Sequence, residues 1–123
     1  MNKLYRVAVS EQEFNIIKNN KNRCIGVADT GEEGVNKNFL ERVSSFFIFK
    51  YIGIENLFDD QCLPTDVCKG DFILLSMVKE TGCVDISCQR MTIKIDEVHQ
   101  FRNNEINIYL YEYSFLEPSY FFQ

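Results

Sequence analysis

Apolar and polar residues alternate at the start of the chain and predict a strand followed by a helix. Between residues 3 and 9, every second residue is aromatic or β-branched, the period of a strand with one buried face. Ser10-Glu-Gln-Glu13 then has the spacing of a capping box, in which the side chains of Ser10 and Glu13 each accept from the other's backbone amide. We expect the following helix to bury Phe14 and to end at the Asn19-Asn20 pair.

The middle of the chain has a less regular pattern. Residues 23–28 predict a short apolar strand, and the two glycines of residues 29–38 predict an exposed loop. Residues 39–52 fit two structures, because their apolar side chains fall on one helical stripe while Phe46-Phe-Ile-Phe49 also suits a buried strand. We favour a helix capped by Asn38 and ending near Gly53, although periodicity leaves the choice open. Residues 55–67 predict an irregular connection.

Three apolar segments in the last third of the chain predict an antiparallel meander. Residues 72–78 are almost continuously apolar, residues 91–96 alternate, and residues 106–115 return after a hairpin turn at Asn103-Asn104. Both faces of the last strand are apolar or aromatic, so we expect a cover on each. The order is strand, helix, strand, helix and then a three-stranded antiparallel meander. It predicts a single α+β domain over residues 1–123, with a sheet able to curl into a partly closed barrel.

Composition and charge limit the classes of function. The net charge of −5 over 123 residues opposes generic binding to a phosphate backbone and suits either solubility or a basic protein partner. The first six residues lack the apolar core of a signal peptide, and no window approaches the ~18 apolar residues of a membrane span. We therefore expect a cytoplasmic protein that does not enter a membrane, with its five cysteines reduced.

The residues that could carry chemistry do not form a known catalytic or metal-binding pattern. Cys62 and Cys68 have five residues between them, and Cys83 and Cys88 have four, whereas zinc ligands usually form tighter pairs. His99 is the only imidazole that could activate a nucleophile, and it follows a predicted strand. The sequence therefore predicts no catalytic residue, no metal and no cofactor, and whether the chain is an enzyme is left open with a preference against it.

Aromatic residues are concentrated near the end of the chain. Of the eleven Phe and six Tyr, seven fall in the last fifteen residues. Tyr109, Tyr111 and Tyr113 share one face of the last predicted strand, and Glu112 and Glu117 lie nearby. These five residues could present aromatic anchors in an acidic rim to a basic protein, or the tyrosines could pack in the core. The first alternative predicts a small acidic binding protein that masks or inhibits another protein, as immunity proteins do.

A basic cluster supports a second hypothesis. Lys18, Lys21 and Arg23 lie at the end of the first predicted helix and the start of the second strand. Cations are common at the C-terminal end of a helix because its dipole favours them there. They could also line a site for RNA or a nucleoside.

The order of elements resembles the PUA-like superfamily and, within it, the ASCH domains. These are small barrels in which a strand and a short helix precede a Gly-x-Lys-x-x-Glu-x-Arg stretch. The segments that carry the resemblance, within residues 4–98, are Phe14-Asn-Ile-Ile17, Asn19-Asn-Lys21 and Lys69-Gly-Asp-Phe-Ile73. Lys21 matches the stretch, whereas Asn19, Cys24 and Gly26 replace its Gly, Glu and Arg. Because family members bind RNA or hydrolyse modified nucleosides with that Lys and Glu, the resemblance implies an RNA- or nucleoside-binding domain that lacks the hydrolase carboxylate.

Overall fold

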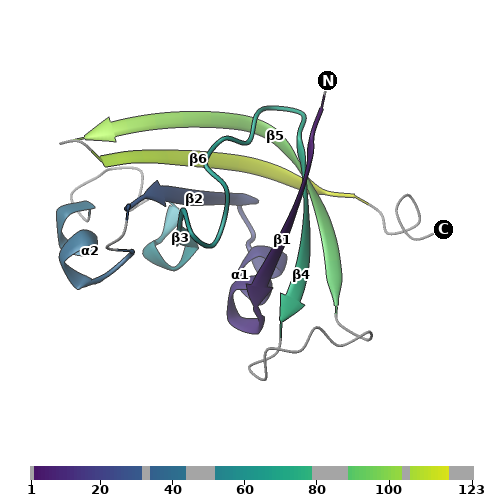
Figure 1. The fold of residues 1–123 in the computed structure, drawn as a ribbon, viewed down its shortest axis with the longest axis horizontal. Coiled ribbons are helices and arrows are strands. Elements are labelled where there is room, and N and C mark those ends of the chain that lie inside the picture. The colour runs from purple at the N-terminus through teal and green to yellow at the C-terminus, as the bar shows by residue number, and fades with distance from the viewer. Residues whose placement is uncertain (1, 32–33, 44–51, 79–88, 104–105, 117–123) are drawn as a thin grey trace.

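A computed structural model describes residues 2–31, 34–43, 52–78, 89–103 and 106–116 of the chain (Figure 1). In these ranges six strands form one mixed sheet, in the order β1-β4-β5-β6-β2-β3. The elements in chain order are β1 (Leu4–Ser10), α1 (Glu11–Asn19), β2 (Cys24–Asp29), α2 (Lys37–Val43), the 3-10 helix η1 (Ile54–Asn56), β3 (Leu57–Asp59), β4 (Phe72–Val78), β5 (Arg90–Asn103) and β6 (Ile106–Phe115).

The predicted α+β fold is wrong. Strands make up 51% of the described structure, which contains two α-helices, and all of the strands belong to a single mixed half-barrel sheet. The sheet includes two parallel pairs, with Tyr5 of β1 opposite Ile73 of β4 and Val27 of β2 opposite Phe58 of β3. Such pairs join segments far apart in the chain, so the local alternation of side chains indicates the strands but not their partners.

The start of the chain folds as its local pattern predicts. The side chain of Ser10 accepts from the backbone amide of Glu13 at 3.1 Å, and that of Glu13 accepts from the amide of Ser10 at 3.0 Å. This confirms the capping box at the start of α1. The helix buries Phe14 and Ile17 and ends at Asn19, with Asn20 as its C-cap residue.

Two expectations for the middle of the chain need correction. The helix α2 begins at Lys37 and is capped by Asn36 rather than Asn38, because the backbone amide of Phe39 donates to the side-chain oxygen of Asn36 at 3.0 Å. Residues 39–43 are thus helical, and residues 44–51 lie outside the described ranges. The segment expected to be an irregular connection contains η1 and β3. A three-residue strand is too short to give a periodic pattern.

Two hydrophobic cores cover opposite faces of β2 and β6. Adjacent residues of a strand point to opposite faces, so Tyr111 enters one core and Leu110 the other. The first, here called the α1 core, includes Phe14, Ile17, Ile25, Val27, Ile73, Ile93, Tyr111 and Tyr113. The second, the α2 core, includes Ala28, Phe39, Ile52, Leu57, Ile106, Ile108 and Leu110. The expectation that both faces of the last strand are covered is therefore confirmed.

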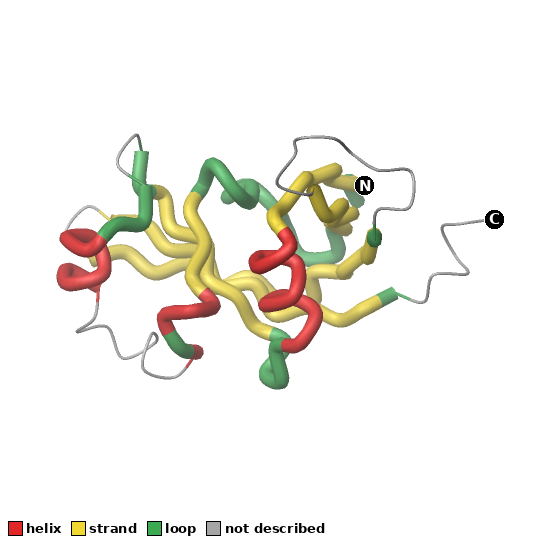
Figure 2. The backbone as a smooth tube through the Cα atoms, turned by 90° about the horizontal axis from the view of Figure 1, so that it is seen from below, coloured by secondary structure: helices red, strands yellow, loops and turns green. Residues whose placement is uncertain are grey.

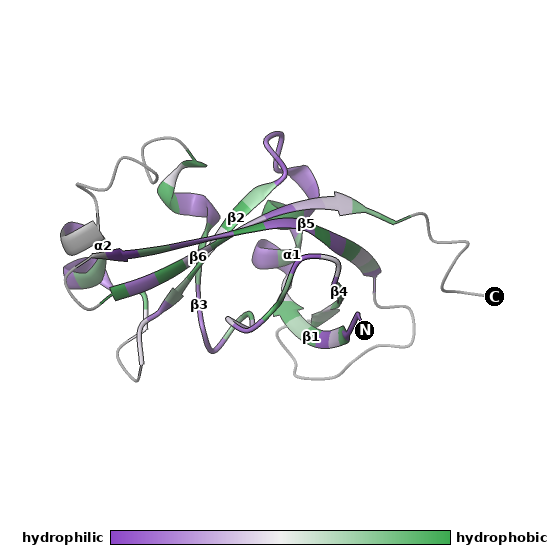
Figure 3. Cartoon of the chain, turned by 90° about the horizontal axis from the view of Figure 1, so that it is seen from above, coloured by the Kyte–Doolittle hydropathy of each residue, from purple (hydrophilic) through white to green (hydrophobic). Residues whose placement is uncertain are grey.

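The helices are spread along the sheet. Figure 2 shows α1 and α2 apart from each other, with η1 between them. Hydrophobic and hydrophilic residues alternate along the long strands β5 and β6 (Figure 3), as expected where each face meets different surroundings. The 3-10 helix η1 thus lies close to α1, with which it is in contact.

Candidate functional site

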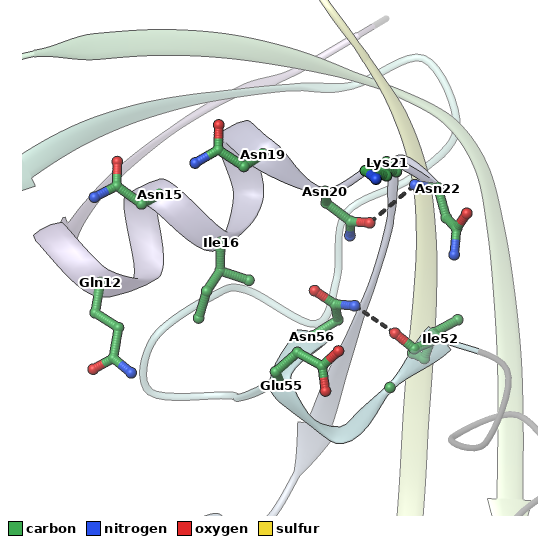
Figure 4. Close-up of a pocket in the computed structure, with 11 residues that line it drawn as sticks. Gln12, Asn15, Ile16, Asn19, Asn20, Lys21, Asn22, Ile52, Glu55 and Asn56 are labelled. Carbon is green, nitrogen blue, oxygen red and sulfur yellow. Dashed lines mark hydrogen bonds between the residues drawn. The ribbon is translucent and has the colours of Figure 1, made fainter.

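An open groove of about 810 Å³ lies between α1 and η1 (Figure 4). It is lined by Gln12, Asn15, Ile16, Asn19, Asn20, Lys21, Asn22, Ile52, Gly53, Glu55 and Asn56. Five of the eleven asparagines of the chain are in this set. The groove is therefore mainly lined by side-chain amides, which both donate and accept hydrogen bonds.

The apolar part of the lining comes from both cores. Ile16 is half-buried and packs against the α1 core, whereas Ile52 is 3% exposed and belongs to the α2 core. One residue associated with each core thus borders the groove, where α1 and η1 meet. Apolar side chains are a minority in a lining that is mostly polar.

Asn20 fixes the turn that leads from α1 into β2. Its amide nitrogen donates to the carbonyl of Cys24 at 2.5 Å, and its oxygen accepts from the backbone amide of Asn22 at 3.1 Å. Both polar groups of this buried side chain are therefore used inside the protein. Arg23 follows with a φ of 53°, a left-handed conformation that non-glycine residues rarely adopt. The turn places the exposed residues Lys21 and Asn22 at the groove.

Other amides of the lining remain available to a ligand. Within the described ranges, the side chains of Gln12, Asn15, Asn19 and Asn22 are exposed and hydrogen-bond to no other residue. Asn56 donates its amide nitrogen to the carbonyl of Ile52, and its oxygen points toward Ile16 (Figure 4). This hydrogen bond fixes the orientation of the amide and leaves its oxygen as an acceptor.

Two charged side chains of opposite sign belong to the described lining. Lys21 comes from the turn after α1 and Glu55 from η1, on the other side of the groove (Figure 4). Both are exposed. Lys21 can only donate hydrogen bonds and ionised Glu55 can only accept them, so the two sides of the groove differ in what they can recognise.

The structure separates the predicted basic cluster. Of Lys18, Lys21 and Arg23, only Lys21 lines the groove, and Lys18 is exposed elsewhere on α1. The guanidinium carbon of Arg23 lies 4.1 Å from the ring centroid of Phe115, in a cation–π contact. The three cations therefore do not form one basic site.

The predicted aromatic interface is largely part of the core. Tyr111 and Tyr113 are 0% and 2% exposed, and their hydroxyls donate to the carbonyls of Pro64 at 2.9 Å and Ile17 at 2.7 Å. Burial raises the pKa of both hydroxyls, so they stay protonated. These two residues therefore belong to the core and not to an interface, because their rings have almost no exposed surface that a partner could contact.

The described remaining members of that prediction, Tyr109 and Glu112, lie on opposite faces of β6. Tyr109 is half-buried against the α1 core. Glu112 is exposed on the opposite face of β6, where its carboxylate lies 2.9 Å from Nε2 of His99. Glu117 lies outside the described residues.

A thiol and a carboxylate pair at the other end of α1. Sγ of Cys62 donates to Oε2 of Glu13 at 2.5 Å, and burial together with the nearby carboxylate raises the pKa of the thiol. Although burial opposes ionisation of Glu13, hydrogen bonds from Cys62 and Ser10 lower the pKa of its carboxyl group. A thiol with a raised pKa is a poor nucleophile, so this pair does not suit cysteine chemistry.

The described residues include no cluster of side chains suited to binding a metal ion. In the part of the chain that the structure describes, no three His, Cys, Asp or Glu side chains are placed to hold one ion. Cys83 and Cys88 lie outside these ranges. No helix in the described ranges has both the length and the apolar character needed to span a membrane.

No family model matches the chain, and no curated protein or solved structure is significantly similar to it. The resemblance to the PUA-like superfamily therefore stays a prediction. The groove includes Lys21, the residue that matches the family stretch. Its other wall, formed by Gly53, Glu55 and Asn56, has no counterpart in the motif.

The sequence contains part of the signal for this groove. Asn15, Asn19, Asn20 and Asn22 form a visible asparagine-rich stretch. The contribution of η1 is not visible, because it depends on how the chain folds after α2. In the fold, these asparagines lie across the groove from Glu55 (Figure 4).

Proposed function

We propose that the chain binds an unpaired nucleobase, in RNA or as a nucleoside, in the groove between α1 and η1. The observation that supports this function best is the set of exposed amides that have no hydrogen-bond partner in the described ranges and surround the half-buried Ile16. Amide side chains match the donor and acceptor groups on the edges of bases. The face of the base would contact the apolar surface of Ile16, and a groove of about 810 Å³ is large enough for it.

Binding fits the lining better than catalysis. The described lining residues include no Ser, Thr, Cys or His, and the carboxylate Glu55 lies opposite a lysine rather than beside a nucleophile. Recognition of an unpaired base also suits a protein with an overall negative charge. Hydrogen bonds to bases then contribute more of the specificity, and contacts to phosphates contribute less.

Titration of fluorescent single-stranded RNA, followed by fluorescence anisotropy, tests this function. We expect Lys21→Ala and Asn22→Ala to weaken binding, because both residues are exposed at the groove. Lys37→Ala and Asn38→Ala on α2 are matched controls, because both residues are exposed and neither lines the groove. Absence of RNA binding at low salt, or equal losses in the control variants, would contradict the proposal.

Masking of a basic protein is a second candidate, and the net charge of −5 favours it. Six of the 18 acidic residues but only two of the 13 basic residues lie outside the described ranges. The described part is therefore closer to neutral than the whole chain. Affinity capture with the tagged protein, analysed for both protein and nucleic acid, separates the candidates. Stoichiometric recovery of one basic protein would support masking, and recovery of nucleic acid alone would contradict it.

A further inference from the structure

We propose that the groove selects guanine, with the carboxylate of Glu55 accepting from the N1–H and N2–H groups of the base and Lys21 donating to its O6. Guanine selection rests on the proposed binding of a base in this groove. It adds the identity of the base and the two charged residues that read it.

The carboxylate of Glu55 lies beside the backbone of Gly53. Gly53 has a φ of 85°, and a Cβ atom built on this glycine would overlap the carboxylate of Glu55. The carboxylate thus occupies space that a side chain at position 53 would fill. In the described part of the structure its two oxygens accept no hydrogen bond from another residue. Both oxygens are therefore available to donors on a ligand.

The Watson–Crick edges of the bases differ in how they meet a carboxylate. Guanine presents two adjacent N–H donors, N1–H and N2–H, which suit the paired oxygens of a carboxylate. Adenine and cytosine each present one amino group next to a ring nitrogen that accepts, so that nitrogen would face the second oxygen and repel it. Uracil presents one N–H between two carbonyls. Of the four RNA bases, guanine is thus the one that can satisfy both oxygens of Glu55.

Lys21 complements the other part of the guanine edge. Its ammonium group can donate to O6, the acceptor adjacent to N1, and contacts from Lys or Arg to guanine acceptors are common in specific recognition. Lys21 and Glu55 come from different walls of the groove (Figure 4). Both side chains are exposed, so both can reach a base that is bound between them. The amide oxygen of Asn56, oriented by the hydrogen bond to Ile52, is a further acceptor on the Glu55 wall.

Anisotropy titrations with short uridine-rich RNAs that differ in one central base test the selection. We expect the wild-type protein to bind the guanine RNA about tenfold more tightly than the adenine, cytosine or uracil RNAs, the ratio that one good bidentate contact gives. Hypoxanthine keeps N1–H and O6 but lacks the N2 amino group, so its RNA should bind more weakly than the guanine RNA. Glu55→Gln should remove most of the preference. Glu11→Gln on α1, exposed and outside the lining, should retain it.

The possible results separate this inference from the proposed function. Equal binding of all the RNAs in a manner that Lys21→Ala still weakens would overturn guanine selection and leave base binding supported. A guanine preference that Glu55→Gln leaves unchanged would show that another group reads the base. Failure of every RNA to bind would overturn both proposals.

Discussion

The two ends of α1 use polar side chains in opposite ways. At the N-terminal end, Ser10, Glu13 and Cys62 hydrogen-bond to one another or to the backbone beside them. At the C-terminal end, Asn20 is used in the same internal way, but the side chains of Asn19 and Asn22 have no hydrogen-bond partner in the described ranges. Both ends look equally polar in the sequence. The difference shows that polar groups satisfied inside the protein hold the fold, while unsatisfied groups at an open surface are available to a ligand.

The same comparison explains which titratable groups are unsuited to chemistry. The Glu13–Cys62 pair has the residue types of a reactive site, yet the thiol donates to a carboxylate that is already part of the helix cap. The raised pKa of the Cys62 thiol follows from burial and from that negative neighbour. Glu55 has the opposite environment, since it is exposed at the groove.

The largest predicted effect comes from removing the core contact that supports the C-terminal end of α1. Tyr113→Ala should reduce the free energy of unfolding by about 3–5 kcal/mol, because it deletes a buried ring and leaves a cavity. Tyr113→Phe keeps the ring and loses only the hydrogen bond to the carbonyl of Ile17, so it should cost about 1 kcal/mol. Urea denaturation measures both. A near-wild-type stability of Tyr113→Ala would contradict a core position and return this residue to the interface hypothesis.

An intermediate effect on stability is expected for Asn20, whose side chain is used inside the protein while its neighbours in the chain line the groove. Asn20→Ala should cost about 2 kcal/mol, because the carbonyl of Cys24 would lose its buried donor and the turn its side-chain support. It should also weaken RNA binding, since Lys21 and Asn22 depend on this turn for their position. Asn22→Ala is the matched control and should weaken binding with a stability change of less than about 0.5 kcal/mol. Equal stability losses in the two variants would remove the distinction between internal and available amides.

The same distinction separates what the sequence could predict from what it could not. The capping box needs only residues three positions apart, so β1 and α1 were recognisable from local pattern. The mixed sheet depends on pairs such as Tyr5 with Ile73, whose meeting local periodicity does not encode. In the groove, the asparagine-rich stretch was visible, but Glu55 joins it only through the fold. The basic cluster was misleading because its third member, Arg23, stacks on the distant Phe115.

The smallest predicted effect concerns the N-terminal end of α1 and is measured as the pH dependence of stability. The pKa of Glu13 is lowered in the folded protein, so its ionised form stabilises the fold above the ordinary carboxyl pKa. This contribution should be lost as the pH falls through the lowered value. Glu13→Gln keeps an oxygen that can accept from the amide of Ser10 but loses the negative charge, so it should cost less than about 1 kcal/mol at neutral pH and should reduce the loss of stability on acidification. Cys62→Ala removes one of the hydrogen bonds that lower this pKa and should reduce the acid-dependent loss by a smaller amount.

Urea midpoints measured from neutral to acidic pH give the comparison, and an unchanged pH dependence in Glu13→Gln would show that the pair contributes nothing to stability. RNA affinity at neutral pH should stay at the wild-type level in both variants, because neither residue lines the groove.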